Sequence, residues 1–311
     1  MASNEAIEFA EFLATLRTRS SDPRLDLPTI RDIIDTVHLA TKEPEGVSYV
    51  ETNVGGVDAL WCIPVGSDDS AVLLHNHMGG TVVASMHSDR KAAAHIAKAA
   101  GVAALVLNYR RSPEHKFPAQ IEDVDNAYRW LLEHGYRPQN IASVGHSIGG
   151  NFAISLVLRL RDSGAPLPGA ILSISPWVDM TINNPTIDSN ADADKLLTRS
   201  LLEMFRSLWL DDTGIEWNDA RVNLLAADLS GLPPTAIYYG ADELLAGEAM
   251  ELAQRAQAAG NDVVLRSVPA GQHSFIVAAG RVPEVDQAIT EMGGWLRFKL
   301  GLGELAAATR I

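Results

Sequence analysis

Short apolar segments alternate with longer helical patterns along most of this chain, and no other feature limits the possible folds as strongly. Eight short segments are rich in Val, Ile, Leu and Ala, and from the third onward they contain few polar residues. Nearly continuous apolar strands are typical of a parallel sheet that helices cover on both faces. The predicted strands span residues 46–52, 59–64, 71–76, 102–108, 141–146, 170–175, 235–239 and 262–268.

Helical patterns fill most of the spaces between these strands. Most of them stop at or near a glycine, which favours the left-handed conformation in which many helices end. A repeated order of strand, helix and strand favours an open, mostly parallel α/β sheet with right-handed connections. The predicted helices span residues 88–100, 119–135, 149–162, 248–259 and 282–300.

Two segments do not follow the alternation. Residues 1–45 are mostly helical in pattern and precede the first strand. Residues 180–228 form a long insertion between the sixth and seventh strands, with a predicted helix at 196–208. Long insertions in compact domains are usually lids or binding elements. We therefore expect one domain over residues 1–311, in which about 1–45 and 180–228 form a helical cap on the sheet.

Charge and composition narrow the classes of partner and location. The chain has 39 acidic and 25 basic side chains, a formal net charge of −14, and such an acidic surface repels the phosphates of nucleic acids. The single cysteine, Cys62, lies in an apolar run and is predicted to be a buried strand residue. No apolar run approaches the roughly 20 residues that span a bilayer, and the acidic N-terminal segment is unlike a signal peptide. We expect a cytoplasmic location and no membrane span.

A candidate nucleophile, Ser147, lies between a predicted strand and a predicted helix. Residues 145–150 read Gly-His-Ser-Ile-Gly-Gly, and a G-x-S-x-G pattern with these flanks is typical of a nucleophile elbow. Glycines allow the sharp turn, so that the serine oxygen projects above the sheet. The helix that starts here directs its backbone N–H groups toward developing negative charge.

The serine needs a base, because a hydroxyl by itself is a weak nucleophile. In enzymes with such an elbow the chain order is serine, acid, histidine. His273 is the only one of the nine histidines that follows Ser147. It lies in a loop after the last predicted strand, and we expect it to be the base.

The expected acid is Asp242, at the end of the seventh predicted strand. Its carboxylate would accept the Nδ1–H of His273 and hold the imidazole in the productive tautomer. Glu243 and Glu248 are the alternatives. We expect Glu243 to point to the other side of the turn, and Glu248 to cap the helix that it begins.

Donors for an oxyanion are expected in the loop after the third strand. Residues 77–80 read His-Met-Gly-Gly, and glycines let the backbone approach a reacting carbonyl closely. The predicted oxyanion hole consists of the N–H groups of Gly79, Gly80 and Ile148.

Taken in order, these motifs resemble the hormone-sensitive-lipase-like branch of the α/β-hydrolases over roughly residues 70–300. Residues 77–80 are similar to the family's His-Gly-Gly-Gly. Further matches are Tyr-Arg-Arg-Ser-Pro-Glu-His-Lys-Phe-Pro-Ala at 109–119, Ser-Pro-Trp at 175–177, Gly-Leu-Pro-Pro-Thr at 231–235 and Asp-Glu-Leu at 242–244. The resemblance implies the α/β-hydrolase fold with a helical cap, ester hydrolysis without a cofactor, and Ser147, Asp242 and His273 as the triad.

The chain departs from the family pattern at three positions. Met78 replaces the first glycine of the oxyanion motif, but the two glycines that supply the donors remain. Ile148 replaces the usual alanine after the nucleophile, and its bulk is expected to narrow the acyl side. His146 replaces the aspartate of G-D-S-A-G, at a position that we expect to face away from the substrate.

Several other side chains could bind a metal or line a pocket, and we expect structural roles for most of them. His75 and His77 form an H-x-H pair, which can bind a metal, but no further Asp or His ligand follows at once, and we expect no metal site. The resemblance implies that His77 organises the oxyanion loop. His87 and Asp89 are expected to cap the next helix. Four candidates for the pocket wall are Trp177, Met204, Phe205 and Trp209.

The expected activity is hydrolysis of small to medium acyl esters through an acyl-enzyme. A lactone hydrolase is the first alternative, because a cyclic ester would use the same triad. A non-catalytic small-molecule receptor on the same scaffold is the second, although plant hormone receptors that resemble this family lack the histidine that His273 supplies. The expected partner is thus a small ester or lactone. Related enzymes are often dimers, so a homodimer is among the expected states.

Overall fold

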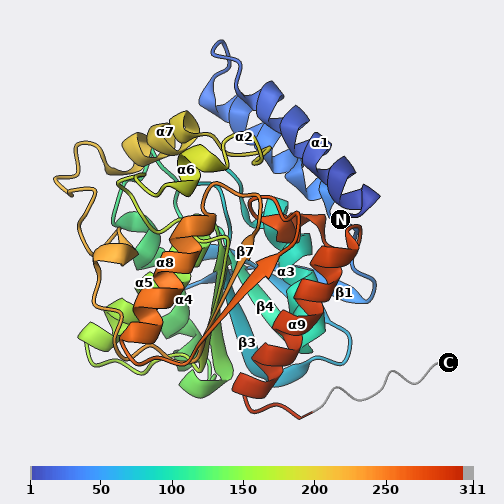
Figure 1. Cartoon of the computed structure of the whole chain (residues 1–311). Helices are drawn as coiled ribbons and strands as arrows, with labels where there is room; N and C mark the ends of the chain where they lie inside the picture. Colours follow the sequence, from blue (N-terminus) through green and yellow to red (C-terminus); the bar gives the residue numbers. More distant parts are fainter. Residues whose placement is uncertain (1, 304–311) are drawn as a thin grey trace.

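The computed structural model describes residues 2–303 and confirms the mostly parallel eight-stranded sheet (Figure 1). The strands pair in the order β1-β2-β4-β3-β5-β6-β7-β8. The pairs of β2 with β1 and with β4 are antiparallel, and the remaining pairs are parallel. The strands are β1 Val47–Val54, β2 Val57–Pro64, β3 Asp68–Asn76, β4 Val102–Leu107, β5 Ile141–His146, β6 Ala170–Ile174, β7 Thr235–Gly240 and β8 Val263–Val268.

Helices cover both faces of the sheet, as its apolar strands predict (Figure 1). Helices α3 and α9 pack against each other on one face, while α4, α5 and α8 lie on the other. None of the helices within residues 2–303 is long and apolar enough to cross a bilayer. The helices are α1 Asn4–Ser20, α2 Leu27–Asp35, α3 Met86–Ala100, α4 Ala119–Glu133, α5 Ile148–Asp162, α6 Thr186–Ser189, α7 Arg199–Leu210, α8 Ala246–Ala258 and α9 Pro283–Lys299.

The helices of the two expected cap segments gather at one end of the molecule. Figure 1 shows α1 and α2 at the top, beside α6 and α7. The Arg17 guanidinium donates to the carbonyl oxygen of Asp194 at 3.1 Å and links the two segments. Helix α7 begins at Arg199, later than predicted, because the Thr198 hydroxyl accepts the Leu201 N–H at 3.1 Å and caps the helix there.

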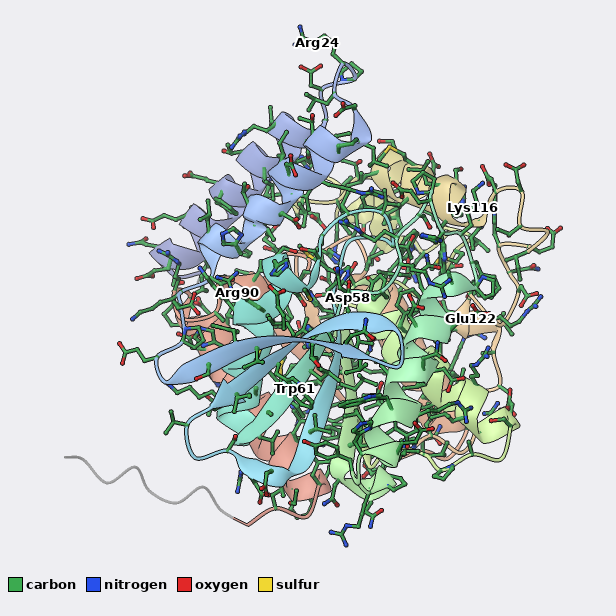
Figure 2. The ribbon with its side chains drawn as sticks, turned by 180° about the vertical axis from the view of Figure 1, so that it is seen from behind. Arg24, Asp58, Trp61, Arg90, Lys116 and Glu122 are labelled. Atoms are coloured by element: carbon green, nitrogen blue, oxygen red, sulfur yellow. The ribbon has the colours of Figure 1, made fainter. Side chains whose placement is uncertain are left out.

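The antiparallel end of the sheet is a hairpin formed by β1 and β2. Figure 2 shows it from behind, with Asp58 near its turn and Trp61 farther along β2. Cys62 lies on the same strand and is fully buried, which confirms its predicted place in the core. Burial raises the pKa of its thiol, so Cys62 is a packing residue.

The parallel strands bring three loops to one edge. Strand β5 ends at His146, β7 at Gly240 and β8 at Val268, and the carboxyl ends of parallel strands share an edge, where ligands of open α/β sheets bind. The loops after these three strands therefore lie close to one another.

Candidate active site

Ser147 occupies a strained turn between β5 and α5. Its φ and ψ are 58° and −126°, outside the regions that side chains usually adopt. A Cβ on Gly145 would lie 2.1 Å from the Gly149 carbonyl oxygen, and one on Gly149 would lie 2.1 Å from the Asn76 carbonyl oxygen. The two glycines of the motif are thus required by close backbone packing, and the turn they allow presents Ser147 above the sheet.

The structure brings Ser147 and His273 into direct contact. The Nε2 atom of His273 lies 2.9 Å from the Ser147 Oγ atom. The serine is 6% exposed and the histidine 2%. This is the geometry in which a general base takes a proton from a nucleophile.

The carboxyl group next to the imidazole belongs to Glu243 and not to the expected Asp242. The Glu243 Oε2 atom lies 3.3 Å from the Nδ1 atom of His273, and Glu243 is fully buried. Asp242 is partly exposed, and no ion pair or side-chain hydrogen bond joins it to His273. The backbone of this turn determines which of the two side chains faces His273. The Glu243 N–H donates to the Gly240 carbonyl at 3.3 Å, and the Asp242 N–H donates to the Gly271 carbonyl at 3.1 Å.

The third acidic candidate, Glu248, has a structural role at the start of α8. Its Oε2 atom accepts the N–H groups of Val178 and Asp179, each at 2.8 Å. Glu248 therefore holds the loop after β6 instead of capping its own helix.

Burial controls the charge of the candidate base and acid. It lowers the pKa of His273 to about 4, while the nearby Asp194 carboxylate opposes that shift. It raises the pKa of Glu243 well above its ordinary value, while the Ser175 side chain and the Gly240 backbone oppose it. Both shifts disfavour an isolated buried charge. At neutral pH His273 is therefore unprotonated and free to accept the serine proton, and the imidazolium then formed lies beside the Glu243 carboxyl group.

The predicted oxyanion loop adopts a conformation that only glycines permit comfortably. Gly79 and Gly80 have φ values of 109° and 58°. A Cβ on Gly79 would lie 2.0 Å from the Val83 carbonyl oxygen, and one on Gly80 2.2 Å from the Phe205 ring. Both glycines line the cavity that contains Ser147 and His273. Ile148 is buried at the first position of α5, where a backbone N–H has no partner within the helix.

His77 holds the backbone of this loop. Its Nδ1–H donates to the Met78 carbonyl at 2.6 Å, and its ring stacks on Tyr109 with centroids 4.0 Å apart. The Tyr109 hydroxyl donates to the His77 carbonyl at 2.9 Å. Burial lowers the pKa of His77 to about 3, so the ring stays neutral.

His75 does not converge with His77. It pairs instead with Asp89, whose two carboxylate oxygens lie 2.5 Å from His75 Nε2 and 2.6 Å from His146 Nε2. All three side chains are buried. The cluster has residue types that can ligate a metal, but each Nε2 atom is already hydrogen-bonded to Asp89. Asp89 is therefore a buried partner of two histidines, and the helix cap expected of it is supplied by Ser85.

The cavity at Ser147 is small and almost wholly apolar. Its volume is about 40 Å³. Of the four predicted wall residues, Trp177 and Phe205 line this cavity. Trp209 lies outside it and donates to the Gln120 side chain, and Met204 is exposed. The other apolar wall residues come from both cap segments and the oxyanion loop: Leu16, Ile34, Met78, Val83, Leu196, Leu197, Leu201 and Leu202.

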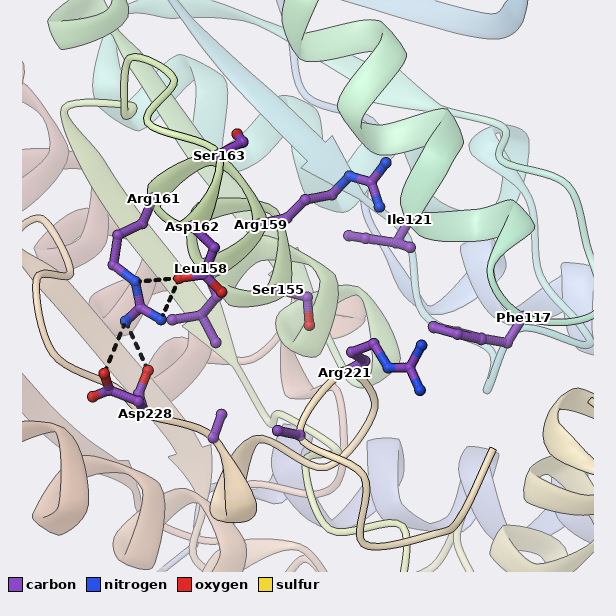
Figure 3. Close-up of a pocket in the computed structure, with 12 residues that line it drawn as sticks. Phe117, Ile121, Ser155, Leu158, Arg159, Arg161, Asp162, Ser163, Arg221 and Asp228 are labelled. Carbon is purple, nitrogen blue, oxygen red and sulfur yellow. Dashed lines mark hydrogen bonds and ion pairs between the residues drawn. The ribbon is translucent and has the colours of Figure 1, made fainter. Parts of the chain in front are cut away.

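A larger groove of about 610 Å³ lies away from this chemistry (Figure 3). None of the proposed catalytic residues lines it. Its three arginines are already paired: Arg159 with Asp125 at 3.0 Å, Arg161 with Asp162 at 2.7 Å and Arg221 with Asp219 at 2.7 Å. The smaller cavity is therefore the candidate active site.

An elbow serine in contact with a histidine, above a mostly parallel sheet, defines a serine hydrolase of the α/β-hydrolase fold. Residues 73–277 match the family described as having the alpha/beta hydrolase fold, and the chain belongs to that family.

Comparison with known proteins refines this assignment. The chain is 36% identical to an acetyl-hydrolase from Streptomyces hygroscopicus over 253 residues, which cover 80% of this chain and 83% of that protein. It is 32% identical to carboxylesterase NlhH from Mycobacterium tuberculosis over 256 residues, covering 77% and 79% of the two chains. A solved esterase of the bacterial hormone-sensitive lipase family matches with a TM-score of 0.91 at 35% identity, covering 97% of this chain and 100% of that one. These similarities confirm the hormone-sensitive-lipase-like branch and the class of serine ester hydrolase.

Proposed function

We propose that the chain hydrolyses short-chain carboxylic esters through a triad of Ser147, His273 and Glu243. The observation that carries the proposal is the 2.9 Å contact between the Ser147 Oγ and His273 Nε2 atoms, with the buried Glu243 carboxylate behind the imidazole. At 3.3 Å the second contact is longer than a typical charge-assisted hydrogen bond of about 2.7–2.9 Å. Such contacts often tighten only when substrate binds.

In the proposed mechanism Ser147 attacks the ester carbonyl carbon while His273 takes its proton. The carbonyl oxygen becomes an oxyanion, which accepts hydrogen bonds from the N–H groups of Gly79, Gly80 and Ile148. His273 then gives its proton to the alkoxide that leaves, and an acyl-serine remains. Water, deprotonated by the same histidine, attacks the acyl-serine, and the carboxylic acid is released as His273 returns the proton to the Ser147 oxygen. Glu243 stabilises the imidazolium in both halves of the reaction.

The cavity volume supports a short acyl group within the expected small to medium range. A volume of about 40 Å³ is a few times the roughly 10–15 Å³ that a cavity needs to hold one water molecule, so it favours a group as small as an acetyl methyl. Phe205 lies against Gly80 and limits the space beside the oxyanion loop. The name of the acetyl-hydrolase relative agrees with this size. We further propose that residues 1–45 and 180–228 act together as a cap that closes this cavity.

The proposal is tested by hydrolysis of p-nitrophenyl esters from acetate to decanoate, with wild type beside Ser147→Ala. We expect activity to be greatest on acetate or propionate, and the variant to fall by several orders of magnitude, as loss of a triad serine does. Labelling by an organophosphonate should occur in wild type and not in Ser147→Ala. Full activity in the variant would show that another residue is the nucleophile.

Lactones are hydrolysed by the same chemistry and are compared in the same assay. Rates on a lactone and on the open-chain ester of matched size separate the two substrate classes. The receptor alternative is set aside, because the histidine whose loss characterises such receptors is present and contacts the serine.

A further inference from the structure

A second buried carboxylate, Asp194, lies between the cap and the catalytic loops. It is 0% exposed and stands in the segment between α6 and α7. Its Oδ1 atom accepts the N–H groups of Leu196 and Leu197, each at 2.8 Å. Its Oδ2 atom accepts the N–H of Leu244 at 2.9 Å. One side chain therefore satisfies three buried amides from two distant parts of the chain.

These three amides belong to functional parts of the site. Leu244 directly follows the proposed acid, Glu243, so the bond to its N–H fixes the turn that carries the carboxylate. Leu196 and Leu197 line the cavity at Ser147. Asp194 thus sets the position of the acid turn and of the cavity wall relative to each other.

Neighbouring hydrogen bonds tie the same cap segment to the histidine loop. Gln272, next to His273, accepts the Lys195 N–H at 2.7 Å and donates to the Ala193 carbonyl at 3.2 Å. The Asn190 side chain donates to the Glu243 carbonyl at 2.9 Å. The segment 190–197 therefore bridges the loops that supply the acid and the base.

Asp194 also contributes charge at the site. Glu243 lies 3.3 Å from the Nδ1 atom of His273. The Asp194 carboxylate is bonded to the N–H of Leu244, the residue after Glu243, and its charge opposes the fall in the pKa of His273. The Arg17 guanidinium of α1 binds the backbone carbonyl of Asp194 and not its carboxylate. Burial raises the pKa of Asp194, and His273 opposes that shift. An imidazolium on His273 would therefore be stabilised by Asp194 as well as by Glu243.

We propose, resting on the hydrolase function above, that Asp194 is a positioning residue, which holds the acid turn against the cavity wall and adds a second negative charge beside the acid turn. The role differs from that of Glu243, because the Asp194 carboxylate is bonded to backbone amides and no hydrogen bond joins it to His273.

The test compares Asp194→Asn, Asp194→Glu and the control Asp192→Asn, which removes an exposed charge two residues away. The readout is the pH dependence of kcat/KM on p-nitrophenyl acetate. Asp194→Asn removes the charge and gives Leu244 N–H an amide donor in place of an acceptor. We expect kcat to fall about 100-fold, as misplacement of a reacting group by about 1 Å can cause. We also expect the acid limb of the pH profile, where kcat/KM falls as His273 becomes protonated, to move to lower pH. Asp194→Glu should lower kcat and leave the limb near its wild-type pH, and Asp192→Asn should match wild type.

Each outcome bears on the proposal. If Asp194→Asn fails to fold by near-UV circular dichroism, Asp194→Ser supplies a second uncharged variant with a hydroxyl that can accept one of the amides. A folded uncharged variant with wild-type kcat and an unmoved acid limb would overturn the proposal, and so would failure of both uncharged variants to fold while Asp194→Glu is fully active. A wild type that hydrolyses no ester would instead overturn the proposed function.

Discussion

The Glu243 Oε2 atom lies 3.3 Å from the Nδ1 atom of His273, and both side chains are buried. This contact places the proposed acid three positions after β7, which ends at Gly240. Neither group carries a charge easily in this environment when alone, whereas together they offset each other's cost of desolvation. The pair is therefore suited to hold a proton only while the reaction is under way.

The pH dependence of activity is expected to reflect the burial of His273. The base must be neutral, so activity is lost as pH falls through the pKa of His273 in the free enzyme. Since burial lowers that pKa to about 4, the acid limb of kcat/KM should lie well below the ordinary histidine value of about 6.5. Initial rates on p-nitrophenyl acetate, with activity after return to neutral pH as a control for unfolding, would show this. A reversible limb at or above pH 6.5 would contradict it.

Gly80→Ala is expected to damage catalysis more than it damages folding. The new methyl group would meet the Phe205 ring at 2.2 Å on a backbone with φ of 58°, so the oxyanion loop must move. Loss of one oxyanion donor costs about 10²–10³ in kcat, and we expect a decrease in that range. Gly56→Ala is the matched control, because Gly56 also has a positive φ but nothing lies within 4 Å of the added Cβ. Equal losses in both variants would show that backbone strain alone is responsible.

Phe205→Ala is expected to shift the preferred acyl chain length upward. Phe205 lies against Gly80 and lines the small cavity at Ser147, so its removal should admit butyrate or hexanoate esters. The control is Met204→Ala on the same helix, at a side chain that is 40% exposed. The ratio of kcat/KM on hexanoate to that on acetate should rise about tenfold or more, the effect of one or two methylene groups in an apolar pocket. An unchanged ratio would mean that another wall sets the acyl length.

His146→Asp, which restores the family residue before the nucleophile, is expected to destabilise this chain. The new carboxylate would face Asp89 in a buried site where His146 now donates at 2.6 Å. Breaking a buried pair costs about 3–5 kcal/mol, which urea denaturation would measure. His87→Asp, at a side chain that is 55% exposed, serves as the control and should change stability little. Asp89→Asn should recover part of the loss in the His146→Asp background, and no recovery would argue against like-charge repulsion.

The sequence predicts the parts of this molecule that local patterns determine. The eight strands follow from apolar runs, Ser147 from its elbow motif, and His273 from its place as the only histidine after the serine. The carboxyl group next to His273 lies one residue after the predicted acid, because two acidic side chains in succession reveal nothing about which one a turn buries. That choice depends on the packing of Gly240 against Gly271, where an added Cβ would meet the Gly271 carbonyl at 2.2 Å.

Contacts between residues far apart in the sequence are harder to predict from local patterns. Asp89 joins His146 across 57 positions, and Asp194 joins Leu244 across 50, so neither pair has a local pattern. Two of the three hydrogen bonds of Asp194 have a local pattern, since an Asp that precedes Lys-Leu-Leu can accept amides two and three residues onward. The bond to Leu244 depends on the fold.

The central claim is that Glu243, and not Asp242, supports His273, and one comparison tests it most directly. The kcat of Glu243→Gln and of Asp242→Asn on p-nitrophenyl acetate would be measured beside wild type, with near-UV circular dichroism to verify folding. We predict a fall of about 10³–10⁴-fold for Glu243→Gln, as when a triad acid becomes an amide, and a change within about twofold for Asp242→Asn, as for a surface substitution. The reverse pattern, with Asp242→Asn nearly inactive and Glu243→Gln close to wild type, would contradict the account.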